Sequence, residues 1–147
     1  MPDAIAGSFT NVYQGISNVL VSDIIVIATK DPKKPQENAK ALWDSGAMCS
    51  VISKDLASKL NLQPVSVKLI STPSGTMDAE LYVVDLLLPN KIEVDRVQVL
   101  GAYPSGSDIL IGMDVIGLGD FAVTNYLNQT AFSFRIPSKE RIDFTIL

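Results

Sequence analysis

The stretch "ALWDSGAMCSVIS" (residues 41–53) ends an apolar run with a single carboxylate, Asp44, which is followed by a serine and a glycine. The chain contains no histidine, so no imidazole is present to take the proton of a serine or cysteine nucleophile. Zinc sites built on histidine or on several cysteines are excluded too, because the chain has one cysteine, Cys49. The chemistry left to this stretch is carboxylate chemistry.

A single carboxylate at its ordinary pKa is a weak base and, once ionised, cannot act as an acid. Two carboxylates about 3 Å apart cannot both ionise, so they share one proton, and one can act as base while the other acts as acid. The chain has no second Asp-Ser/Thr-Gly. A two-fold homodimer would supply the missing partner, because its interface brings the same residue of both chains together.

The composition is that of one globular domain, with 47% hydrophobic residues in 147. The net charge of −4 and the lack of a Lys/Arg cluster argue against nucleic acid as a partner. The apolar stretch 19–28 is too short to cross a bilayer, and the N-terminus has no secretory pattern. We therefore expect a soluble, cytoplasmic protein that needs no disulfide, metal or cofactor and no membrane partner.

Short β-branched or apolar segments alternate with turns rich in Pro, Gly, Asn and Asp, which predicts an all-β protein with a small, mostly antiparallel barrel or sandwich. The predicted strands are 23–29, 40–43, 65–71, 79–88, 92–100, 108–112, 121–124 and 130–136. A short helix is predicted in "SKDLASKLNL", with Ser53 as its cap and Leu56, Ala57 and Leu60 on one face. A second helical turn is predicted after Gly112.

The first twenty residues give an ambiguous pattern. Ile5, Phe9, Tyr13 and Ile16 have the spacing of a helical stripe, although two glycines in the same stretch weaken a helix. We therefore expect residues 1–20 to be an N-terminal extension of uncertain structure and residues 21–147 to form the main domain.

Three segments in order resemble one family. "LWDSGAMCSVIS" resembles the active-site segment of the retropepsin-like aspartic proteases, "DILIGMDVI" (108–116) is similar to the second signature of that family, and "STPSGTM" (71–77) looks like its flap hairpin. The resemblance covers roughly residues 21–136 and is closest to cellular or bacterial members. It implies a small closed antiparallel barrel with one or two short helices, acting as a homodimer.

The resemblance assigns a role to each matching residue. Asp44 would be the catalytic carboxylate, Ser45 would hydrogen-bond across the dimer, and Gly46 would let the two turns approach closely. The residues expected to line the substrate cleft are Ala47 in the turn, Ser74, Gly75 and Thr76 at the flap, and Ile111 and Gly112 behind the turn. The implied activity is an aspartic endopeptidase that holds an extended peptide under glycine-tipped flaps.

Less specific interpretations accompany these. Asp44 could simply end a strand in a turn, and Asp114 is expected to cap the second helix rather than to act in catalysis. Cys49 is expected to be a small buried residue, with a redox role as the alternative. Met77 and Met113 are expected to fill gaps in the core, with the lining of a pocket as the alternative. Trp43 could face either side of its strand. The alternative function is a retropepsin-like dimerisation or peptide-binding module in which cleavage does not matter.

Overall fold

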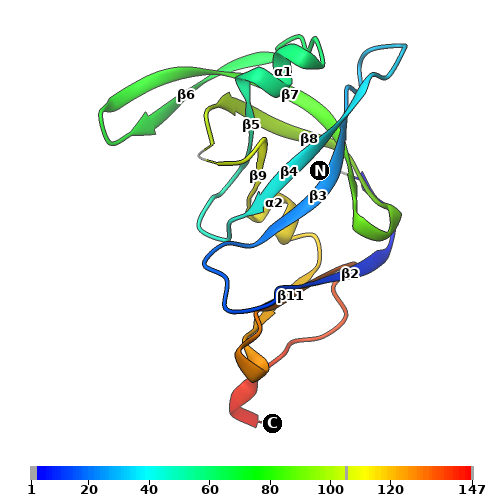
Figure 1. Ribbon diagram of the computed structural model, residues 1–147. Coiled ribbons are helices and arrows are strands. Elements are labelled where there is room, and N and C mark those ends of the chain that lie inside the picture. Colours follow the sequence, from blue (N-terminus) through cyan, green and yellow to red (C-terminus); the bar gives the residue numbers. More distant parts are fainter. Residues whose placement is uncertain (1–2, 105, 147) are drawn as a thin grey trace.

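The computed structural model describes residues 3–104 and 106–146, and it is built mainly of β-strands (Figure 1). Two short α-helices interrupt the strands, α1 at Lys54–Lys59 and α2 at Met113–Ile116. The strands are β1 Asp3–Ala4, β2 Gly7–Val12, β3 Val21–Ile27, β4 Gln36–Trp43, β5 Ser50–Ser53, β6 Ser66–Thr72, β7 Gly75–Leu88, β8 Ile92–Ala102, β9 Ile109–Ile111, β10 Asp120–Thr124 and β11 Ala131–Ile136. Single 3₁₀ turns lie at Pro89–Lys91, Tyr126–Asn128 and Phe144–Ile146.

Six of the strands close into a barrel. They lie in the order β8-β5-β9-β4-β3-β7, and β7 also pairs with β8, which completes the ring. The pairings are antiparallel except for β4 with β9 and β5 with β8, which are parallel. β1 and β6 are added outside this ring. The predicted all-β fold with a small closed barrel and two short helices is confirmed.

The barrel interior is filled by β-branched and other apolar side chains that alternate along the strands, as a sheet with one buried face requires. Val26, Ala41, Ile52, Val84 and Ile109 are fully buried, at 0% exposure. Helix α1 adds to this core in the predicted way. Its cap, Ser53, accepts the N–H of Leu56 at 3.1 Å, and Leu56, Ala57 and Leu60 are buried.

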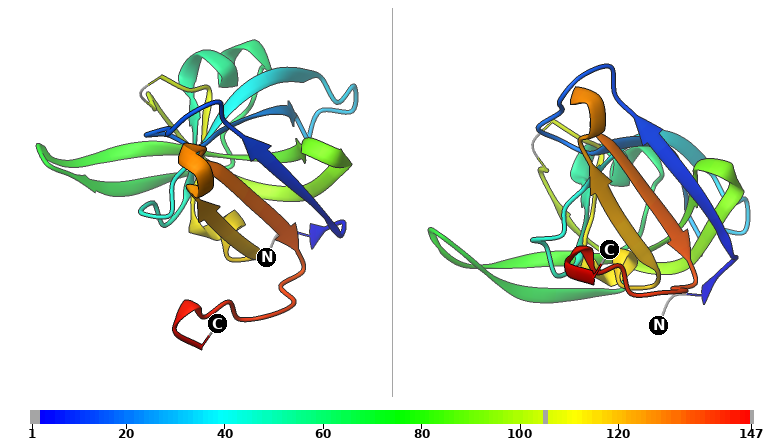
Figure 2. Two further views of the ribbon diagram at one scale, coloured as in Figure 1. Left: turned by 60° about the horizontal axis from the view of Figure 1, so that its bottom comes forward. Right: turned by 90° about the horizontal axis from the view of Figure 1, so that it is seen from below.

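A second, three-stranded sheet lies against the barrel, in the order β10-β11-β2 (Figure 2). Phe9, Phe132 and Phe134 are its buried aromatic residues. The helical stripe considered for residues 5–16 is absent, because residues 7–12 form the strand β2 and both Ile5 and Ile16 are exposed. The division of the chain at residue 20 stays a prediction.

Candidate active site

Asp44 directly follows β4, at a point where three strands fix its position. β9 lies between β4 and β5, pairing Trp43 with Ile111 on one side and Val51 with Leu110 on the other. The N–H of Asp44 continues the first ladder and donates to the carbonyl of Ile111 at 2.9 Å. Residues 44–49 therefore form a turn that crosses the end of β9.

The turn is closed by hydrogen bonds to Asp44 itself. The N–H of Gly46 donates to Oδ1 of Asp44 at 2.8 Å, and the N–H of Ala47 donates to its carbonyl at 3.2 Å. Asp44 is half-buried, whereas Ser45 and Gly46 are exposed. A Cβ on Gly46 would lie 3.1 Å from Oδ1, which is a tight contact. The carboxylate is thus held by the backbone at an accessible edge of the barrel.

Gly112 lies directly behind the turn. A Cβ at this position would lie 2.8 Å from the carbonyl oxygen of Ala47 and 2.9 Å from that of Cys49, closer than side chains pack. The next residue, Met113, donates its N–H to the carbonyl of Ala47 at 2.8 Å. Glycine is required here by close backbone approach. Ile111, just before it, is fully buried.

Asp114 ties the end of the turn to α2. Its Oδ2 accepts the N–H of Ser50 at 2.9 Å, and its Oδ1 accepts the Ser50 hydroxyl at 2.8 Å. The same hydroxyl oxygen accepts the N–H of Gly112 at 3.1 Å. The prediction that Asp114 caps the second helix holds only in part: Gly112 is the N-cap, but Oδ1 of Asp114 also accepts the N–H of Val115, in the first turn of α2, at 3.0 Å.

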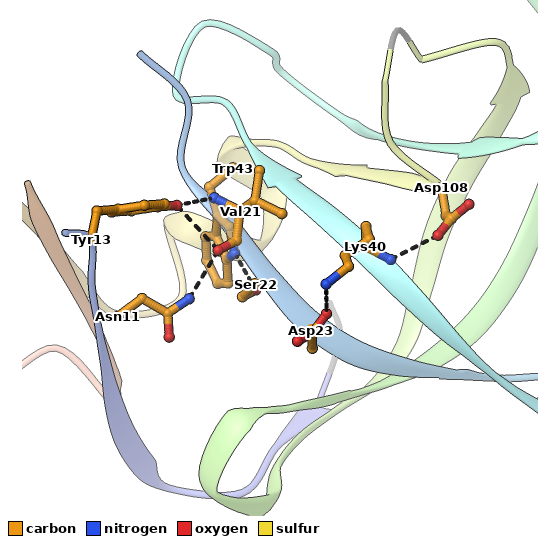
Figure 3. A network of polar contacts seen from close by, with 8 residues as sticks. All are labelled: Asn11, Tyr13, Val21, Ser22, Asp23, Lys40, Trp43 and Asp108. Atoms are coloured by element: carbon orange, nitrogen blue, oxygen red, sulfur yellow. Dashed lines mark hydrogen bonds and ion pairs between the residues drawn. The ribbon is translucent and has the colours of Figure 1, made fainter. Parts of the chain in front are cut away.

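Trp43 holds β4 from the opposite side of the barrel wall. Its side chain is buried, and its indole N–H donates to the hydroxyl of Ser22 at 2.8 Å (Figure 3). Its ring lies 5.8 Å from that of Phe121 in a stacked arrangement and 5.0 Å from that of Phe134. Aromatic pairs at such distances add to the hydrophobic contribution. The three-stranded sheet therefore fixes the residue that precedes Asp44.

Further polar contacts brace the strands around Trp43 (Figure 3). The hydroxyl of Tyr13 accepts the N–H of Val21 at 2.6 Å, and the side-chain amide of Asn11 donates to the Val21 carbonyl at 2.9 Å. Asp108, just before β9, accepts the N–H of Lys40 on β4 at 2.8 Å. These bonds link the sheet that contains β2 to β3, and β4 to the start of β9.

The hairpin of β6 and β7 projects from the barrel on the side where the 44–49 turn lies, at the left of Figure 1. Residues 73 and 74 form its two-residue turn, because Thr72 pairs with Gly75. Gly75 has φ of +126°, a backbone conformation that suits glycine. Ser74 and Thr76 adjoin it and are exposed.

The predicted site residues therefore form two groups. Asp44, Ser45, Gly46, Ala47, Ile111 and Gly112 lie together around the turn, and Ser74, Gly75 and Thr76 lie at the far end of the hairpin. The predictions for sulfur-containing residues are wrong. Cys49 is exposed because it ends the turn, and Met77 and Met113 are 45% and 44% exposed instead of filling the core.

Two side chains away from the turn, Asp120 and Tyr82, have shifted pKa values. Asp120 accepts hydrogen bonds from the Ser138 hydroxyl, the Lys139 N–H and the Arg135 guanidinium, and these hold its pKa well below the ordinary range. Burial and a hydrogen bond to Glu80 raise the pKa of Tyr82 to about 12. Asp120 thereby fastens the segment after β11 to the edge of the three-stranded sheet.

Neither a metal site nor a membrane span is found in the described part of the chain. Within residues 3–104 and 106–146, no three Cys, Asp or Glu side chains are grouped so that they could hold a metal ion. None of the described helices has the length and hydrophobicity needed to cross a bilayer.

Comparisons with known proteins bear on the family and the fold of the chain. The profile of the family described as "Aspartyl protease" matches residues 34–115. A retropepsin-like aspartic protease from Rickettsia conorii superposes with a TM-score of 0.58 at 12% identity, over 90% of this chain and 96% of that one. The protease of simian foamy virus (mac) aligns at 19% identity and a TM-score of 0.47, over 67% and 92% of the two chains. No curated protein sequence matches the chain.

Proposed function

Since the chain belongs to the aspartyl protease family and has the retropepsin-like fold, we propose that it is an aspartic endopeptidase that acts as a homodimer. The observation that carries the proposal is the position of Asp44. It is the carboxylate of a turn that backbone N–H groups close, at an accessible barrel edge, in a chain without histidine. One such turn supplies half of a paired-carboxylate site, and a second copy related by a two-fold axis supplies the other half.

In this dimer the two Asp44 carboxylates share one proton. The ionised carboxylate takes a proton from a water molecule, which attacks the scissile carbonyl, while the protonated one donates to the carbonyl oxygen. Gly46 keeps the space above Oδ1 free of a side chain, and Ser45, exposed beside Asp44, hydrogen-bonds to the partner turn. The rate should follow a bell-shaped pH curve on the acidic side of neutrality, whose two limbs belong to the pair.

The substrate is an extended peptide that lies between the turn and the β6–β7 hairpin. An extended peptide can bond to the backbone of a hairpin as an added strand, with its side chains directed alternately to the two faces. The hairpin projects beyond the barrel on the side of the turn, and Ser74, Gly75 and Thr76 would act as the flap. Ala47, Ile111 and Gly112 would form the opposite wall of the cleft.

The test is the substitution Asp44→Asn. Wild type and variant are each incubated at mildly acidic pH with a chemically unfolded protein as substrate, and the products are identified by mass spectrometry. The wild type should generate new peptide termini, and Asp44→Asn should reduce them to background because both carboxylates of the pair are lost. The variant dimer should be at least as stable at neutral pH, since no like charges then face each other. Asp55→Asn, an exposed acid on α1, is the matched control and should retain activity.

Cleavage that persists in Asp44→Asn would contradict the proposal, and so would a variant that fails to fold. In either case Asp44 would be a structural residue, and the alternative of a dimerisation or peptide-binding module would replace the enzyme.

A further inference from the structure

A cavity of about 240 Å³ adjoins the end of the 44–49 turn. Its walls come from five elements: the turn contributes Cys49, β6 Lys68, β7 Leu81, β8 Arg96 and Leu100, and α2 Asp114. A larger cavity of about 570 Å³ lies between residues 28–32 and 61–65, and no residue of the turn lines it. The smaller cavity is thus the one that connects the hairpin with the turn that carries Asp44.

The base of this cavity is apolar. Leu81 and Leu100 face each other across the β7–β8 pair, and each is 7% exposed. With Val51 and Ile70 they belong to a small cluster separate from the barrel core. The volume is below the range of pockets for drug-sized ligands, so the cavity has room for a single side chain with an apolar stem.

The rim of the cavity carries more basic than acidic side chains. Lys68 and Arg96 are basic, and Asp114 is acidic. That carboxylate is already engaged by the N–H and the hydroxyl of Ser50. The ammonium of Lys68 forms no ion pair with another described residue. Such a rim is notable in a chain with a net charge of −4, because the average surface of this protein is acidic.

We propose that this cavity is a specificity pocket that takes an acidic side chain, glutamate or aspartate, of the bound peptide at a position flanking the scissile bond. The methylene stem would pack on Leu81 and Leu100, and the carboxylate would pair with the ammonium of Lys68. The inference rests on the proposed peptidase function for its substrate. Because a two-fold dimer has two such pockets, the preference should appear on both sides of the cleaved bond.

The first test maps the sequence around cleavage sites in a digest of unfolded proteins. Wild-type sites should be enriched in Glu and Asp at one position on each side of the cleaved bond. Lys68→Glu should remove that enrichment and favour Lys or Arg instead, by about threefold to tenfold. Lys33→Glu, an exposed lysine outside the cavity, is the matched control and should leave the preference unchanged. Enrichment that is absent in the wild type, or unchanged in Lys68→Glu, would overturn the proposal.

The second test does not depend on proteolysis. Cys49 is the one cysteine of the chain, is exposed and lines the cavity, so its alkylation reports on the local charge. We would divide the rate of alkylation by anionic iodoacetate by the rate with neutral iodoacetamide. The fraction of Cys49 present as thiolate multiplies both rates equally, so it drops out of this ratio. Lys68→Glu should lower this ratio by about threefold to tenfold, whereas Lys33→Glu should not.

The two tests separate the two claims. If the wild type cleaves nothing but the ratio falls in Lys68→Glu, the peptidase proposal has failed and the anion-selective pocket stands. If cleavage occurs but the ratio is the same in all three proteins, the pocket proposal is refuted and the peptidase proposal remains.

Discussion

Asp114→Ala is the substitution whose effect on the turn can best be calculated. It removes the acceptors of the Ser50 N–H and hydroxyl, which lie 2.9 and 2.8 Å from the carboxylate, while Ser50 stays 0% exposed. Hydrogen bonds to a charged group contribute about 1.5–3 kcal/mol each. Water can enter from the adjoining cavity of about 240 Å³ and replace part of this loss. We therefore expect the free energy of unfolding to fall by about 3 kcal/mol.

The assay is thermal and denaturant unfolding of the two single variants, Asp114→Ala and Ser50→Ala, and of the double variant. For a domain of this size the loss corresponds to a melting temperature lower by about 6–12 °C. Ser50→Ala should cost less, because the backbone N–H of residue 50 keeps its bond to Asp114. The effects of the two substitutions should not add fully, because both remove the bond between the Ser50 hydroxyl and the carboxylate. Asp78→Ala, an exposed acid on the hairpin, should change stability by less than about 0.5 kcal/mol. A loss in Asp114→Ala as small as in this control, or full additivity, would mean that the bonds between Asp114 and Ser50 do not stabilise the turn.

Three further predictions concern parts around the site. Trp43→Phe leaves the buried hydroxyl of Ser22 without its indole donor, so unfolding in urea should show a loss of about 1–3 kcal/mol; unchanged stability would contradict this. The hydrogen bond from Ser138 is the main cause of the low pKa of Asp120. Ionised Asp120 therefore stabilises the fold at pH values above the ordinary pKa of 3.8, and this stabilisation is lost as the pH falls below 3.8. Melting curves should show that loss in the wild type and not in Asp120→Asn. Gly75→Val, which forces a β-branched residue to φ of +126°, should slow peptide turnover without unfolding the protein; equal turnover would place the flap elsewhere.

Much of the fold could be predicted because its signals are local. Runs of β-branched residues bounded by turn residues marked eight strands, and Ser53 with its helical apolar stripe marked α1. Three strands escaped because their stabilisation is tertiary, among them the two-residue β1, which is held by β8. β5 is only four residues long and is held by β8 and β9, and β2 is held by β11. Pairing with a distant strand produces no alternation of apolar and polar residues in the sequence of β2 or β5, so the sequence alone does not distinguish these strands from a loop or a helix.

The site was predictable only in part, for a similar reason. The resemblance to retropepsin-like proteases led us to expect Gly112 behind the turn, and the close approach of Gly112 to the backbone of the turn agrees with that position. The bonds of Asp114 to Ser50 and of Trp43 to Ser22 join residues far apart in the chain, and they depend on strand register.

In the proposed dimer, one active site uses an Asp44 from each of two chains. We would mix wild-type protein with increasing amounts of Asp44→Asn under conditions where subunits exchange, at constant total concentration, and measure peptide cleavage. If both carboxylates are required, only wild-type dimers cleave, so activity should fall with the square of the wild-type fraction. Activity that falls in simple proportion to the wild-type fraction would mean that each chain works with its own Asp44 alone, and would rule out a site shared between two chains.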